Sequence, residues 1–145
     1  MPGELYLEIV TAERLVYSGP VTYVSAPGSE GRLGILPSHA ALLCSLRPGE
    51  LRLQPRGDDE EISIAIGGGF LEVSNDRVIV LAHSAERATE IDTQRAVEAR
   101  ERALRRLQSR ESGVDVERAR AAMERAEARL RVAERHRLAR GDQGR

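Results

Sequence analysis

Short stretches of alternating apolar and polar residues fill the first half of the chain. In Leu5–Val10 every second side chain is apolar, and Ile62–Ile66 repeats this period of two, which is typical of strands that bury one face. Turn residues separate such stretches, for example at Gly19-Pro20 and Ser74-Asn75-Asp76. The pattern predicts a β-sandwich, or flattened barrel of about ten short strands, over residues 1–85.

The pattern becomes helical between residues 91 and 138. Apolar side chains there recur every three or four positions, and the segment contains no proline. Two antiparallel helices are predicted on either side of a break at Ser109–Asp115. Their contact is mostly alanine, which lets two backbones approach closely but buries little apolar surface. The predicted contact positions are Ala96, Ala99, Ala103 and Leu107 in the first helix and Val116, Ala119, Met123, Ala126, Leu130 and Ala133 in the second.

Capping signals mark where both helices begin. Thr89 and Asp92 have the spacing of a capping box, and Asp92 is itself a second candidate for the cap. Asp115 has the same role before the second helix, which we expect to end near Leu138. The chain is thus α+β, with a β-domain over residues 1–85, an antiparallel two-helix hairpin over 86–138 and a disordered polar tail over 139–145.

Charge distinguishes the two halves. Residues 1–85 hold 6 arginines and 11 acidic residues, whereas residues 86–145 hold 16 and 12, and lysine is absent. The single cysteine, Cys44, excludes an intramolecular disulfide and a metal-thiolate cluster, and its apolar surroundings predict an inert thiol. There is no signal peptide pattern and no apolar run long enough to span a membrane.

Catalytic chemistry is not indicated. His39, His83 and His136 are far apart in sequence, and no metal-binding or nucleophile motif accompanies them. His39 follows Pro37-Ser38, where a loop or interface histidine is a simpler interpretation than a general base. Gly67-Gly68-Gly69 lies between two predicted strands and lacks the lysine of a phosphate loop, so a bulge or strand corner is expected. The sequence predicts no catalytic residue and no metal site.

The arginines of the hairpin allow two interpretations. Arg95 and Arg102 share one face of the first helix, and Arg125 and Arg129 share one face of the second. If the hairpin closes, both pairs can face one pocket suited to a triphosphate, because a guanidinium binds phosphate oxygens through a rigid fork of donors. The alternative is an ordinary solvated helix face. Nucleic-acid binding is disfavoured, because acidic residues interleave with the arginines and aromatic side chains are missing from this half.

Three motifs, in order, resemble those of the epsilon subunit family of bacterial F-type ATP synthases. They are Gly31-Arg32-Leu33-Gly34-Ile35-Leu36-Pro37-Ser38-His39-Ala40, Gly68-Gly69-Phe70-Leu71-Glu72-Val73, and Ala85-Glu86-Arg87-Ala88 followed by Ile91-Asp92-Thr93-Gln94-Arg95-Ala96. The likeness extends over about residues 4–138. The sequence differs from the family pattern at Arg32, where an acidic residue is usual, and at Ala41, where proline is frequent.

The resemblance implies a non-catalytic rotor subunit in the central stalk of the F1 sector. Its partners would be the gamma subunit and the c-ring, and in an extended hairpin state the catalytic beta subunits and the alpha subunits. It would couple rotation and inhibit ATP hydrolysis through the mobile hairpin. It would lie on the cytoplasmic face of the bacterial membrane, bound there only through the complex, without nucleic acid and without a required cofactor.

Nucleotide-binding members of the family carry an Ile-Asp-x-x-Arg-Ala motif and arginines from both helices. By resemblance, this chain binds ATP as a regulatory ligand in the contracted state, through Glu86, Ile91, Asp92, Arg95, Ala96, Arg102, Arg125 and Arg129. The same resemblance places the contact with gamma and the c-ring at Glu30, Gly31, Arg32 and His39. Three alternatives remain: a constitutively folded scaffold module without nucleotide, an enzyme, and an RNA-binding hairpin.

Overall fold

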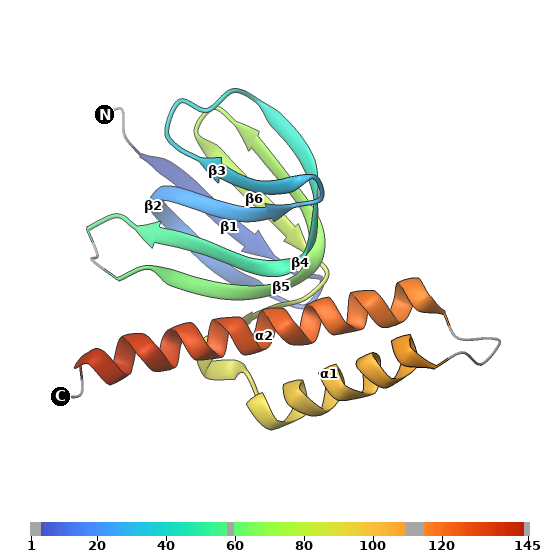
Figure 1. Ribbon diagram of the computed structural model, residues 1–145. Coiled ribbons are helices and arrows are strands. Elements are labelled where there is room, and N and C mark those ends of the chain that lie inside the picture. Colours follow the sequence, from blue (N-terminus) through green and yellow to red (C-terminus); the bar gives the residue numbers. More distant parts are fainter. Residues whose placement is uncertain (1–3, 58–59, 110–114, 144–145) are drawn as a thin grey trace.

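The computed structural model describes residues 4–57, 60–109 and 115–143. Its first half is a β-barrel and its second half is a helical hairpin on one side of that barrel (Figure 1). The seven strands of the described residues are β1 (Leu5–Val10), β2 (Leu15–Gly28), β3 (Gly31–Ile35), β4 (Leu42–Pro55), β5 (Ile62–Ser74), β6 (Arg77–Ala82) and β7 (Ala85–Arg87). The helices are η1 (Ala88–Glu90, a 3₁₀ turn), α1 (Thr93–Gln108) and α2 (Val116–Gln143).

Strand pairing closes the sheet on itself. The order is β1-β6-β5-β4-β2-β3, and β1 also pairs antiparallel with β2, so that five strands form a closed ring and β3 extends it at β2. The β1–β6 pair is parallel, with Leu7 opposite Val78. The apolar side chains of the alternating pattern point inward, and the largest fully buried ones include Leu5, Leu7, Ile9, Leu51, Leu53, Ile64 and Leu71. The predicted fold class is therefore confirmed.

The strands are fewer and longer than predicted. Gly19-Pro20, expected to be a turn, lies inside β2, with Pro20 opposite Tyr6. Proline is compatible with extended backbone, and the Pro20 carbonyl still accepts a hydrogen bond from the Arg56 N–H at 3.1 Å. Likewise, β4 runs as one strand of 14 residues from Leu42 to Pro55. By contrast, the hairpin at Asn75-Asp76 is confirmed, and both residues adopt positive φ as a tight hairpin turn requires.

The three glycines form a corner inside β5, as predicted. Before the corner β5 pairs with β7, and after it β5 pairs with β6. Gly68 and Gly69 have φ of 97° and 146°, and a Cβ at Gly69 would lie 2.1 Å from the Leu81 carbonyl oxygen. The corner therefore depends on residues without a side chain.

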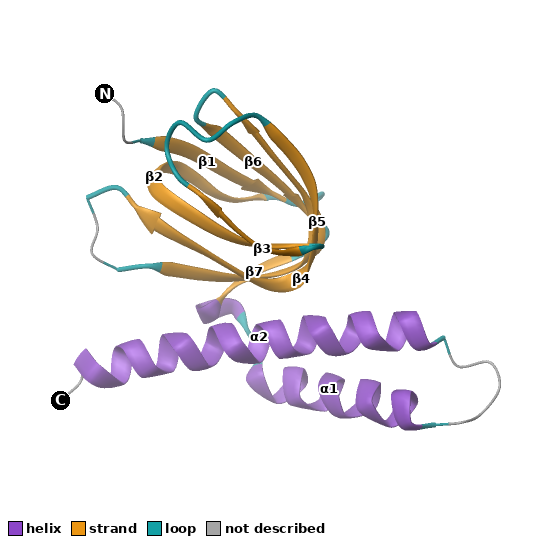
Figure 2. Cartoon of the chain, turned by 45° about the horizontal axis from the view of Figure 1, so that its top comes forward, coloured by secondary structure: helices purple, strands orange, loops and turns teal. Residues whose placement is uncertain are grey.

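Helix α2 lies between the barrel and α1, as both ribbon views show (Figures 1 and 2). It contacts α1 through the predicted seam, where Ala96, Ala103, Ala119 and Ala126 are buried. A second face, carrying Ala128 and Val132, packs on Ala65 of β5. Val116, the first position of the predicted seam in the second helix, is 47% exposed and does not contribute to the contact between α1 and α2.

The caps explain where the helices begin. The Asp92 carboxylate accepts the Arg95 N–H at 3.1 Å, so Asp92 and not Thr89 caps α1. Asp115 accepts the Arg118 N–H at 3.0 Å and starts α2 as predicted. Of the predicted disordered tail, residues 139–143 are helical instead, because Ala139 and Arg140 favour a helix and one glycine costs only about 1 kcal/mol. Residues 144–145, and residues 110–114 of the predicted break, lie outside the described residues.

Candidate functional site

A cavity of about 380 Å³ opens where the end of the barrel meets both helices. It is lined by Glu86 of β7, Glu90 of η1, Asp92, Arg95, Ala96, Ala99 and Arg102 of the α1 region, and Arg129 of α2. Its size lies within the range of small-molecule sites, about 300–1,000 Å³. Because three separate parts of the chain supply the walls, the cavity exists only while the hairpin is closed and docked.

The acidic side chains of this cavity already have partners. Glu86 accepts a hydrogen bond from Arg129 Nε at 2.5 Å, and both side chains are about 30% exposed. Glu90 pairs with Arg14 at 2.8 Å and accepts the Arg87 N–H at 2.9 Å. These hydrogen bonds, first that from Arg14 and then that from Arg87, lower the pKa of Glu90, so its carboxyl stays ionised. With Asp92 occupied as a helix cap, no acidic group of the cavity is left over.

Arg95 and Arg102 are the cations that remain. They lie two turns apart on the cavity face of α1, both are exposed, and neither guanidinium has an acidic partner among the described residues. Together with Arg129 they surround the cavity from two helices. This arrangement fits a polyanionic ligand, since fork-like donors can bind several phosphate oxygens.

Two of the sequence-predicted ATP residues lie elsewhere. Arg125 does not line the cavity: its Cδ would lie 3.3 Å from a Cβ at Gly67, so its side chain lies beside the glycine corner of β5. Ile91 packs with Ala65 and Val132 in the contact between α2 and the barrel. The predicted convergence is thus found for three of the four arginines. Arg125 lies outside the cavity because it is on the face of α2 that packs toward the barrel.

Three residues of the site were not predicted. Glu90 and Ala99 line the cavity, and Arg14 of the β1–β2 turn holds Glu90 while also donating to the Ala85 carbonyl at 3.1 Å. For Ala99 the sequence offered a signal, because it follows Ala96 by three residues and therefore shares its face of α1. Arg14 offered none, since it is 76 residues from its partner.

The positions predicted to contact the rotor have different environments. Glu30 and Gly31 lie exposed at the β2–β3 turn. His39 is half-buried in the loop after β3, and its Nδ1–H donates to the Ala40 carbonyl at 2.7 Å. Arg32 instead points along the sheet, where it donates to Ser25 Oγ at 2.8 Å and to the Glu50 carbonyl at 2.5 Å. The unusual arginine is therefore engaged within the barrel.

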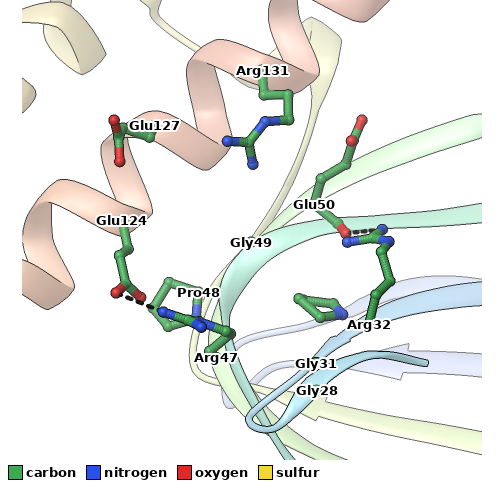
Figure 3. Close-up of a pocket in the computed structure, with 11 residues that line it drawn as sticks. Gly28, Gly31, Arg32, Arg47, Pro48, Gly49, Glu50, Glu124, Glu127 and Arg131 are labelled. Carbon is green, nitrogen blue, oxygen red and sulfur yellow. Dashed lines mark hydrogen bonds and ion pairs between the residues drawn. The ribbon is translucent and has the colours of Figure 1, made fainter.

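A second cavity, of about 300 Å³, lies between α2 and the β2–β3 turn (Figure 3). Arg47 of β4 pairs with Glu124 of α2 at 3.0 Å across it. Beside it, Glu50 of β4 is buried, with 3% exposure, and its carboxylate points away from Arg32 in Figure 3. That carboxylate accepts hydrogen bonds from Arg135 Nε at 2.6 Å and Nη2 at 3.1 Å. The ion pair joins the distal half of α2 to the barrel.

An apolar strip crosses the outer surface of the barrel. Phe70, Leu81, Val10 and Leu15 are successive cross-strand neighbours on β5, β6, β1 and β2. Phe70 is 52% exposed, and Leu81 and Leu15 are each 56% exposed. Contiguous exposed apolar rows are typical of interaction surfaces.

The described residues offer neither a metal cluster nor a membrane-spanning helix. Within residues 4–57, 60–109 and 115–143, no three histidine, cysteine or acidic side chains are grouped to hold a metal ion. In the described part of the chain, no helix is long and apolar enough to cross a membrane.

Fold and site together define a two-part α+β protein, in which a closed barrel and a docked hairpin share one arginine-lined cavity. Family models of the ATP synthase delta/epsilon chain match both parts, the beta-sandwich domain over residues 4–88 and the long alpha-helix domain over residues 89–134. The chain therefore belongs to the ATP synthase delta/epsilon family. As the sequence predicts, this is a family of non-catalytic subunits of the ATP synthase complex.

Individual relatives agree with this assignment. The ATP synthase epsilon chain of Desulforamulus reducens is 49% identical over 106 residues, which cover 73% of this chain and 79% of the relative. That of Dehalococcoides mccartyi strain BAV1 is 55% identical over 101 residues, 70% of this chain and 71% of the relative.

Solved structures give the same picture. A chain in the mitochondrial ATP synthase of Euglena gracilis, from a structure of OSCP, F1 and the c-ring, superimposes with a TM-score of 0.79. It is 26% identical, and the match covers 92% of this chain and 82% of that one. A chain in the central stalk and c-ring of the Tetrahymena thermophila enzyme, 15% identical, has a TM-score of 0.53 over 91% of this chain and 95% of that one, which shows a shared fold.

Proposed function

We propose that this chain is the epsilon-type central-stalk subunit of a bacterial F-type ATP synthase and that its hairpin is a regulatory arm controlled by ATP. The gamma subunit and the c-ring are its partners through the barrel. The beta and alpha subunits are its partners when the hairpin is extended, and in that state the arm opposes ATP hydrolysis. The subunit lies on the cytoplasmic face of the bacterial membrane as a peripheral part of the complex.

Family membership supports the rotor role, and the barrel surface is consistent with it. The strip of Phe70, Leu81, Val10 and Leu15 offers an apolar area of the kind that a permanent partner buries. We assign this strip to gamma. Glu30, Gly31 and His39 remain the proposed c-ring contact, whereas Arg32 contributes through its hold on the β2–β3 turn.

One observation carries the regulatory proposal: the arginine-lined cavity is built jointly by β7–η1, α1 and α2. A ligand in it contacts all three and is lost when they separate. ATP therefore binds the docked hairpin with higher affinity than the released one and shifts the equilibrium by that difference. Arg95 and Arg102 bind phosphate oxygens directly, and Arg129 joins them by exchanging its bond to Glu86.

A constitutively folded scaffold is the second candidate. It is favoured by the ion pair between Arg129 and Glu86, which satisfies one wall of the cavity without any ligand. Measurement of ATP binding distinguishes the two candidates, because a scaffold binds no nucleotide.

Isothermal titration calorimetry of the isolated protein with ATP tests the proposal. Saturable binding is expected, and Arg102→Ala should weaken it by about tenfold or more, because a charge-assisted hydrogen bond to phosphate is lost. Arg100→Ala is the matched control, since Arg100 is also exposed on α1 but does not line the cavity. Absence of saturation at millimolar ATP would establish the scaffold instead, and equal losses in both variants would overturn the assignment of the ATP site to this cavity.

A further inference from the structure

The docking surface beneath α2 contains one buried carboxylate and more than one arginine. Glu50 and Arg52 lie two residues apart on β4 and therefore on the same face of the sheet. Opposite them on β5 are Ala65 and Ser63, and the Ser63 hydroxyl donates to Glu50 at 2.8 Å. Ala128 and Val132 of α2 cover Ala65. The charged group and the apolar contact are thus parts of one interface.

Only one of these arginines holds the carboxylate in the docked state. Arg135 of α2 binds both carboxylate oxygens of Glu50. Arg32 is occupied by Ser25 and the Glu50 carbonyl. The Nε of Arg52, by contrast, is buried and has no hydrogen-bond partner among the described residues. In the docked state a buried donor is thus unsatisfied two residues from an acid that already has a partner, which is unfavourable.

The positive charges also act on one another. Burial, together with the charges of Arg52, Arg131 and Arg135, lowers the pKa of the Arg32 guanidinium despite the nearby Glu50. Burial alone would raise the pKa of Glu50. Hydrogen bonds from Arg135 and Ser63 and the charges of Arg135 and Arg52 outweigh it, so that the pKa lies below its usual value. Arg52 is therefore close enough to stabilise the ionised carboxylate.

We propose that Arg52 competes with Arg135 for Glu50, so that docking of α2 exchanges one ion pair for another. When α2 lifts away, Arg52 turns to the carboxylate two residues before it and satisfies its own Nε–H. When α2 returns, Arg135 displaces Arg52. The exchange reduces the net gain from docking and keeps the docked and released states close in free energy. This inference rests on the proposed function, because it requires a hairpin that can be released.

Thiol labelling of the full chain can measure the released state even when it is rare. Ala65→Cys, in a Cys44→Ser background, places a probe beneath α2 that is 4% exposed in the docked state. Ala26→Cys in the same background places a probe in the barrel core, where Ala26 is 0% exposed, and reports unfolding of the barrel. Labelling at position 65 that is faster than at position 26 measures release of α2.

The competition makes a counter-intuitive prediction. Arg52→Met, which keeps most of the apolar stem, should slow labelling at position 65 by about tenfold, since the competitor and the unsatisfied donor are both removed. Arg52→Lys should label at close to the original rate, because a cation that can reach Glu50 remains. In a Glu50→Gln background, Arg52→Met should slow labelling clearly less, because only the unsatisfied donor is removed and there is no carboxylate left to compete for.

The results distinguish failure of the competition from failure of the regulatory function. If labelling at position 65 is no faster than at position 26, the hairpin is not released, and both the regulatory function and the competition are wrong. If release occurs but Arg52→Met slows it equally with Glu50 present and in the Glu50→Gln background, or leaves it unchanged, the competition alone is overturned. A variant of Arg52 that fails to fold is recognised by fast labelling at position 26. In that case Arg52→Lys provides the test, and slower labelling at position 65 in Arg52→Lys than in the original chain would contradict the competition.

Discussion

Val132→Ala tests whether the barrel and the hairpin are separate units held by a weak interface. The Val132 side chain is fully buried and packs with Ala65 and Ala128 between α2 and the barrel. Removal of two methyl groups costs about 1.6 kcal/mol at ~0.8 kcal/mol per group, and the remaining cavity raises this to about 2 kcal/mol. Because α2 stays helical when released, the better helix propensity of alanine cancels between the two states. The released fraction should increase roughly 30-fold.

Distances between two spin labels can measure that fraction. Ser74 at the end of β5 and Arg105 on α1 are exposed, so cysteines there, in a Cys44→Ser background, carry the labels without disturbing the core. The docked hairpin gives one distance and the released hairpin a broad second population. Val132→Ala should increase the second population and leave urea unfolding of the barrel unchanged within about 0.5 kcal/mol.

Val116→Ala provides the control, because it makes the same chemical change at a residue of α2 that is 47% exposed. It should leave the distances unchanged. If Val132→Ala lowers the stability of the barrel and the docked fraction together, the two parts form one cooperative unit and the reasoning is refuted. The same holds if Val116→Ala has an equal effect.

Three further predictions concern the barrel and its contacts. Gly69→Ala should destabilise the barrel by at least about 2 kcal/mol in urea unfolding, because its φ is 146° and the new Cβ would lie 2.1 Å from the Leu81 carbonyl oxygen, whereas Gly34→Ala, with open space around it, should be near neutral. The pKa of Glu50 is depressed, although burial opposes this, by Arg135 and Ser63 and by the charge of Arg52. Its stabilisation is therefore complete above the unfolded value of about 4.5 and is lost as the pH falls through the lower folded pKa. The unfolding free energy of the wild type should decrease relative to Glu50→Gln below about pH 4.5, and parallel pH profiles would contradict this. Phe70→Ser combined with Leu81→Ser should abolish capture of the gamma subunit, while Leu36→Ser, at a leucine 62% exposed outside the strip, should not; retained capture by the double variant would exclude the strip as the interface.

Most of the fold was predictable because its signals are local. Alternation in Leu5–Val10, the turn at Asn75-Asp76 and the caps Asp92 and Asp115 each depend on neighbouring residues, and each is found. The wrongly predicted turn at Gly19-Pro20 is different, because glycine and proline also occur in extended strands. Only the pairing of Pro20 with Tyr6, a contact distant in sequence, decides between them.

The site was predictable where the residues share one helix face. Arg95 and Arg102 are seven positions apart and line the cavity together. Arg125 and Arg129 satisfy the same rule but separate, since α2 packs on α1 and on the barrel at once. Sequence spacing cannot say which of two apolar faces dominates. The ion pair of Glu50 with Arg135 joins residues 85 positions apart, and nothing local predicts it.

The regulatory proposal requires that ATP selects the docked hairpin. Its most direct test is the distance distribution of the chain labelled at positions 74 and 105, in the Val132→Ala background where the released population is measurable, recorded with and without millimolar ATP. We expect ATP to restore the single docked distance and Arg102→Ala to prevent this. A distribution that ATP leaves unchanged would contradict the proposal.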